Sequence, residues 1–109
     1  MNSKNIQKKL EQIRLSYIAS LAEKKEAIDT HWSTLKTNWD TEIHDAMYLI
    51  IHGIAGSAET FGMPELTQQA RTILELLKRV NDDSIDEHLV EKIDDEISKL
   101  LNKLKSKND

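Results

Sequence analysis

Apolar residues recur along most of the chain at spacings of three and four, which is the period of one face of an α-helix. The first series predicts a helical region from about Lys4 to Thr37, with a break near Ser16 into a short leading helix and a longer one. Its apolar positions are Ile6, Leu10, Ile13, Tyr17, Leu21, Ile28, Trp32, Leu35 and Trp39.

The next two predicted helices are bounded by residues that favour helix ends. One helix begins near Asp40 or Thr41, which are N-cap residue types, and runs to Phe61. Gly62 suits the position after its C-terminus, and Pro64 suits the first turn of the following helix. The expected inward positions are Ile43, Met47, Ile50, Ile54, Ala58 and Phe61 in the first of the two, and Leu66, Ala70, Ile73, Leu74 and Leu77 in the second.

The last predicted helix follows a polar connection. The preceding helix should end near Val80, and Asn81–Asp83 form the connection. Ser84 and Glu87 have the spacing of a capping box, which predicts that the last helix starts there. We expect this helix to fray over residues 105–109 and to bury Leu89, Ile93, Ile97, Leu100 and Leu104.

These elements predict an all-α fold. Three glycines and one proline leave little material for hairpins or tight turns, and 109 residues suffice for one domain of ordinary size. Amphipathic helices with short connections must bury one another's apolar faces. We therefore predict a single domain over residues 1–109, an antiparallel four-helix bundle with an additional N-terminal helical segment.

Composition excludes several function classes. The chain has no cysteine, which excludes a disulfide framework and a thiolate zinc site, and its net charge of -4 argues against broad nucleic-acid binding. Its strongest apolar stretch, Ala46–Ala58, is too short to span a bilayer. We find no signal-peptide pattern and expect a cytoplasmic protein that does not bind membranes.

The strongest chemical clue is a histidine and a glycine four residues apart in the middle helix. His52 lies about 200° around the helix from Ile50, so its side chain should point away from the core towards solvent. Gly56 falls on the same face, one turn later. A neutral imidazole is a nucleophile, and the missing side chain at position 56 would give another molecule room to reach it.

Two explanations of this pattern compete. Gly53 and Gly56 each cost a helix about 0.8–1 kcal/mol relative to alanine, which calls for a reason. Both could allow close helix packing beside an ordinary surface His52. Alternatively, Gly56 clears the approach to His52, which suits its outward position better, whereas close packing suits Gly53.

The segment from His52 to Leu66 resembles the histidine-containing phosphotransfer (Hpt) domain of bacterial two-component phosphorelays. The family signature has an aliphatic residue two positions after the histidine, glycine four after and serine or alanine five after, then an aromatic or leucine followed by glycine. Ile54, Gly56, Ser57, Phe61 and Gly62 occupy these positions. The resemblance implies a helical bundle built around a four-helix core.

The resemblance also implies a function. His52 would exchange a phosphoryl group with an aspartate of a response-regulator receiver domain, which itself supplies Mg²⁺ and a lysine, and a hybrid histidine kinase is a further expected partner. The chain would be a monomeric phosphocarrier that needs no cofactor and has no catalytic machinery of its own. The expected partner-binding residues are Tyr48, Leu49, Ala55, Gly56 and Glu59, and Gly53 and Ser57 would support His52 from behind.

Tyr48 and Ser57 also have structural explanations. Tyr48 would either form an apolar shoulder for the receiver or lie half-buried against a neighbouring helix. Ser57 would bond to a carbonyl one turn earlier or orient the imidazole, or serve only as a small residue for tight packing.

The chain departs from the family at two positions near the histidine. Many members carry Lys or Arg one or three residues after it, where this chain has Gly53 and Ala55. A partner would then have to supply more of the positive charge, and Glu59 should weaken phosphate affinity. This departure leaves one alternative open, a helical adaptor or regulator that docks on a kinase or receiver without accepting phosphate. A further alternative is a structural bundle that self-associates through its outward apolar residues.

The other histidines do not form a metal-binding pattern. His31, His44 and His88 lie on different predicted helices, and none forms an i, i+4 pair with another histidine or a His-Glu-x-x-His arrangement. We expect surface or boundary positions for all three and no metal site.

Overall fold

A computed structural model describes residues 3–80 and 86–108, and the side chains among these up to residue 105. In this part of the chain there are four helices and no strand, which confirms the all-α prediction. They are α1 (Ser3–Thr37), α2 (Thr41–Thr60), α3 (Pro64–Lys78) and α4 (Glu87–Asn108). The predicted connection Asn81–Asp83 and the predicted capping serine, Ser84, lie outside the described residues.

The ends of α2 follow the predicted signals. The Asp40 carboxylate accepts a hydrogen bond from the backbone N–H of Ile43 at 3.1 Å, which caps the first turn. At the other end, Gly62 has a φ angle of 69°, a left-handed conformation that side chains disfavour. Pro64 then occupies the first turn of α3, where its missing N–H costs no hydrogen bond.

One predicted helix boundary was wrong. The break near Ser16 does not exist, because α1 is one helix of 35 residues with no glycine or proline to interrupt it. The α3 helix ends at Lys78, close to the end that we predicted near Val80. The α4 helix extends to Asn108, and the fraying expected over residues 105–109 stays a prediction.

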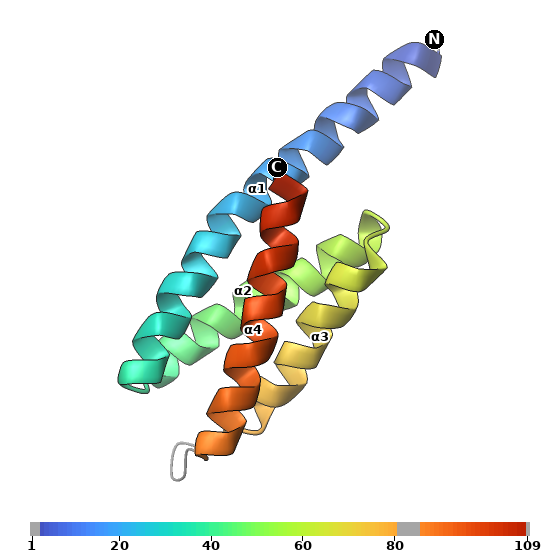
Figure 1. The fold of residues 1–109 in the computed structure, drawn as a ribbon. Coiled ribbons are helices and arrows are strands. Elements are labelled where there is room, and N and C mark those ends of the chain that lie inside the picture. Colours follow the sequence, from blue (N-terminus) through green and yellow to red (C-terminus); the bar gives the residue numbers. More distant parts are fainter. Residues whose placement is uncertain (1–2, 81–85, 109) are drawn as a thin grey trace.

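The four helices form a bundle in which α1 and α3 each pack against α2 and α4 (Figure 1). Because α2 lies between α1 and α3, it has two flanks inside the molecule and one outward face. The core between the helices is almost entirely aliphatic. Its largest fully enclosed side chains are Leu21, Ile28, Met47, Ile51, Ile54, Leu66, Ile73, Leu77, Ile93, Ile97, Leu100 and Leu104.

The buried stripe of α2 is rotated from the predicted one. Met47, Ile54 and Ala58 are buried as expected, but Ile51 is fully enclosed whereas Ile50 is only half-buried. The cause is packing on both α1 and α3, since two neighbours cover a wider arc than a single stripe. Although α2 is the most apolar helix, no helix among the described residues is long and apolar enough to span a membrane.

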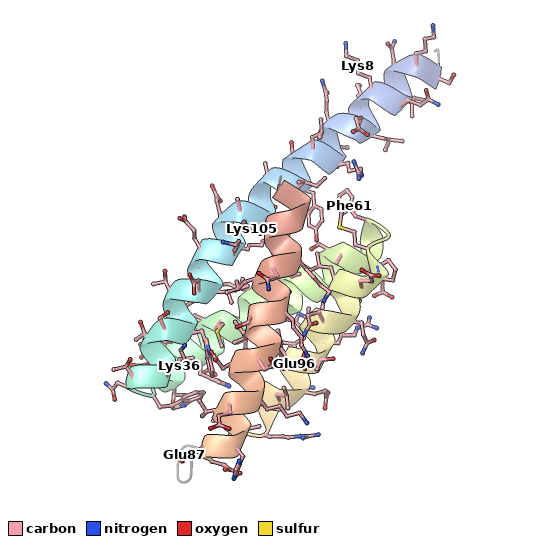
Figure 2. All side chains as sticks on the ribbon, in the orientation of Figure 1. Lys8, Lys36, Phe61, Glu87, Glu96 and Lys105 are labelled. Atoms are coloured by element: carbon pink, nitrogen blue, oxygen red, sulfur yellow. The ribbon has the colours of Figure 1, made fainter. Side chains whose placement is uncertain are left out.

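The first part of α1 extends beyond the bundle. The molecule is 59 Å long and about 20 Å across, and Figure 1 shows that the N-terminal turns of α1 cause this length. Lys8, which is labelled in Figure 2, lies on this projection, and Lys36 lies at the opposite end of α1. The large apolar residues of the projection remain exposed, with accessible fractions of 48% for Ile6, 60% for Leu10, 54% for Ile13 and 54% for Leu15.

Polar contacts link α4 to its two neighbours. The buried indole of Trp32 donates a hydrogen bond to the Asp94 carboxylate at 2.8 Å, and the Lys36 ammonium lies 3.2 Å from the same oxygen. On the other side, the buried Gln69 amide donates to Glu96 and accepts from Lys103 at 3.1 Å. These contacts satisfy buried polar groups and fix how α4 sits against α1 and α3.

The projecting and enclosed parts of α1 should differ in their effect on stability. We expect Ile28→Ala to lower the free energy of unfolding by about 2–5 kcal/mol, because this side chain is 0% exposed and its removal leaves a cavity. Ile6→Ala should change the free energy by less than about 0.5 kcal/mol. Urea denaturation of both variants measures the difference, and equal losses would contradict this assignment of the core.

Asp94 should make stability sensitive to acid. The Trp32 N–H, followed by Lys36, lowers the pKa of Asp94 below its ordinary value of 3.8, against the opposing effect of burial. A lowered pKa contributes stability above the unfolded-state pKa, and this contribution is lost as the pH falls through the folded-state pKa. We expect Asp94→Asn to cost about 1 kcal/mol at pH 7, and the gap to wild type to narrow as the pH falls below 3.8 and the carboxylate becomes protonated. Thermal unfolding across this pH range is the measurement, and a gap independent of pH would refute the assignment.

Candidate functional site

His52 is exposed in the middle of α2, as predicted. The helix period places it opposite Ile54, which is fully buried. Among the described residues no hydrogen bond or ion pair involves the imidazole, and its recorded contact is with the Tyr48 ring, whose centroid is 6.4 Å away at an interplanar angle of 21°. The ring is therefore held beside one aromatic neighbour while its nitrogens remain available to another molecule.

A column of rings leads along α2 to His52. The Trp39 and His44 centroids are 5.4 Å apart, and the His44 and Tyr48 centroids are 6.4 Å apart. His44 is anchored at both nitrogens: Nε2 lies 3.1 Å from the Leu77 carbonyl oxygen of α3, and Nδ1 lies 3.0 Å from the Asp45 carboxylate. This column ties the outward face of α2 to α3. It also makes Tyr48 half-buried, as one of its two sequence interpretations predicted.

The two glycines near His52 both face open space. A Cβ atom built at Gly53 or at Gly56 would meet no atom within 4 Å outside its own local helix. This fits the clearance that we predicted for Gly56. The prediction that Gly53 permits close helix packing was wrong, because no neighbouring helix approaches it. The helix therefore carries two glycines that packing does not require.

Exposure separates the predicted partner-binding residues into two groups. Leu49, one turn before His52, is 69% exposed, which is unusual for a leucine and leaves an apolar surface beside the imidazole. Ala55 is only 6% exposed and belongs to the core. Its placement on the partner-facing surface was therefore wrong, because position 55 lies on the flank of α2 that α3 covers.

Glu59 has a cationic partner that the sequence did not reveal. The Arg71 guanidinium of α3 lies 2.9 Å from the Glu59 carboxylate, and both side chains are largely exposed. Helix rise puts Glu59 about 10 Å from His52 along the α2 axis. The ion pair offsets the negative charge that we expected to disfavour phosphate, and it forms the α3 flank of the site.

Ser57 forms the α1 flank. Its hydroxyl donates to the Gly53 carbonyl one turn earlier at 2.8 Å, which confirms the first of its predicted roles. Its oxygen also lies 3.0 Å from the Tyr17 hydroxyl of α1. The Tyr17 ring in turn stacks on Phe61 with centroids 4.4 Å apart. The sequence pattern had identified Tyr17 only as an apolar position, because a contact across 40 residues has no local signal.

The other histidines and the acidic residues do not gather into a metal-binding group in the described part of the chain. Within it, no group of three or more His, Asp or Glu side chains could hold a metal ion. His31 and His44 are half-buried and His88 is exposed, in agreement with the boundary or surface positions predicted for them. The reactive group on this surface is therefore the exposed imidazole of His52. An apolar shoulder, an open glycine face and an ion pair two turns away surround it.

Comparison with known proteins gives one match. A family model described as "Hpt domain" matches residues 7–103, which is most of the chain and covers α2, α3 and most of α1 and α4. No curated protein and no solved structure matches the chain.

The open space at the two glycines leads to a stability prediction. We expect Gly53→Ala and Gly56→Ala each to raise the free energy of unfolding by about 0.8–1 kcal/mol, because alanine favours the helix and its methyl group meets no neighbour. Chemical denaturation measures both variants. Gly62→Ala serves as a contrast and should be destabilising, because its φ angle is 69°. A loss of stability in Gly56→Ala would show that the glycine serves the fold rather than the surface.

Proposed function

The chain belongs to the Hpt domain family, whose members have a histidine phosphotransfer role in phosphorelays, and we propose that His52 is its phosphoryl acceptor and donor. The partner in this exchange is an aspartate of a response-regulator receiver domain, and a hybrid histidine kinase can stand upstream. The observation that carries the proposal is the exposure of this one imidazole at the family's histidine position, with open space at Gly56.

The reaction requires little from this chain beyond position. A ring nitrogen of neutral His52 attacks the phosphorus of the receiver's aspartyl phosphate with its lone pair. The phosphorus–oxygen bond breaks, and its electron pair returns to the aspartate carboxylate. The ring N–H proton of the resulting phosphoimidazolium then passes to solvent. Because phosphoryl transfer depends mainly on alignment and charge neutralisation, Mg²⁺ and lysine on the receiver can supply the remaining chemistry.

The surface around His52 fits a receiver in two ways. Leu49 and the Tyr48 ring provide an apolar shoulder on the N-terminal side of the imidazole. Gly56 leaves the C-terminal side open, so that the receiver's active-site loops can approach the imidazole. Glu59 and Arg71 add a paired polar edge beyond it. The chain then acts as a monomeric phosphocarrier, and the cytoplasmic location expected from the sequence stays a prediction.

Labelling by a phosphorylated receiver tests the proposal. We expect wild-type protein to acquire acid-labile, alkali-stable phosphate, and His52→Gln to acquire none because the nucleophile is gone. His88→Gln is the matched control, since that histidine is also exposed but lies at the start of α4. Equal label on wild type and His52→Gln would rule the proposal out. Tight receiver binding without any label would favour the adaptor function instead.

A further inference from the structure

Lys24 provides a cation on the flank of α2 that faces α1, although no Lys or Arg follows His52 within α2. The bond between Ser57 and Tyr17 shows which flank of α2 faces α1. Helix geometry puts Ser57 about 140° around the axis from His52, and Gly53 about 100° around in the same direction. Gly53 therefore lies between His52 and the α1 helix on the surface of α2.

Lys24 is the cation on this flank. Its ammonium lies 5.8 Å from the centroid of the Tyr17 ring, within range of a cation–π contact, and the side chain is half-exposed. Phe61 stacks on one face of that ring with an interplanar angle of 6°. Since α1 and α2 run antiparallel and Tyr17 contacts Ser57, Lys24 lies two turns further along α1, about 10 Å back along α2 from that contact. This places Lys24 near the level of Gly53 and His52 along the α2 axis.

Both glycines keep the path from Lys24 to His52 open. Neither position has any neighbouring atom within 4 Å of a Cβ, so no packing requirement explains the absence of side chains. A larger residue at position 53 would stand between the α1 flank and the imidazole. The cost of two glycines in one helix is explained if the space between α1 and His52 has to stay open.

We propose that Lys24 reaches across Gly53 and neutralises the phosphoryl group carried by His52. This inference rests on the proposed function and adds a charge-stabilising residue to it. A lysine side chain on α1 takes the place of a cation on α2 itself, so the chain supplies positive charge that we had expected only from its partner. The flexible stem of Lys24 lets it remain over Tyr17 until a phosphoryl group is present.

Phosphoramidate, a small phosphoryl donor, tests the role of Lys24 without any receiver. The nitrogen–phosphorus bond of the donor breaks as ammonia leaves with the electron pair, and a His52 ring nitrogen forms the new bond to phosphorus. The ring proton passes to ammonia, which leaves as ammonium. Phosphorus NMR follows the initial rate at which phosphohistidine appears.

We expect Lys24→Ala to lower this rate by about fivefold, from the loss of one cation close to a doubly charged group. Lys25→Ala is the matched control. It removes the same charge from the next residue of α1. Lys25 faces α4, because it lies seven residues before Trp32 on the same face of the helix, and the Trp32 indole donates to Asp94 of α4. The rate of this control should stay within about twofold of wild type. Added salt at 1 M should reduce the effect of Lys24→Ala, because at this ionic strength charges more than about 3 Å apart are screened from one another.

A second variant separates charge from structure. Gly53→Lys in the Lys24→Ala background puts an ammonium on the same side of His52 and should restore most of the rate, whereas a structural role for Lys24 predicts no rescue. Equal rates for wild type, Lys24→Ala and Lys25→Ala, with label on His52, would overturn the role of Lys24 alone. Absence of phosphohistidine in wild type, or label that persists in His52→Gln, would overturn the proposed function and this inference with it.

Discussion

The structure depends on the two-sided burial of α2. This helix packs against both α1 and α3, and its apolar residues Ile51, Ile54 and Ala58 are completely enclosed between them. Burial of these side chains removes apolar surface from water, which is the main favourable contribution to folding. Once that arc is fixed, the opposite arc of the helix has to face solvent. His52 is exposed because the buried residues Ile51, Ile54 and Ala58 occupy the opposite arc of α2.

The two flanks of α2 give the exposed arc its chemical character. On the α3 side, the imidazole of His44 bonds to the Leu77 carbonyl, and Glu59 pairs with Arg71. On the α1 side, Ser57 meets the hydroxyl of Tyr17. His52, the nucleophile that we propose, is thus carried on a helix whose orientation is held from both sides. Such fixed orientation suits a transfer reaction that depends on alignment.

Open space is the second constraint on this surface. Two glycines weaken α2 as a helix, and the structure shows no packing benefit in return. Both leave open space beside His52, which in our proposals admits a receiver at Gly56 and Lys24 at Gly53. The helix propensity of α2 is therefore lower around His52 than alanines would make it. Such local departures from the most stable sequence are expected at functional sites.

The sequence by itself determined the four helices, most of their ends, and the exposure of His52 beside Gly56, because these follow from helix periodicity and from the local chemistry of caps, Gly62 and Pro64. It missed the continuity of α1, since a weak apolar pattern near Ser16 does not interrupt a helix that contains no breaker. It also misplaced Ala55, because one inward stripe cannot describe a helix with two neighbours.

Only the tertiary structure decided which side chains of other helices lie on the two flanks of α2. Arg71 of α3 pairs with Glu59, and on the α1 side Tyr17, with Lys24 over its ring, contacts Ser57 across 40 residues. Such pairings depend on how antiparallel helices are rotated and shifted against one another. That arrangement is set by packing of the whole core, and no local stretch of sequence encodes it.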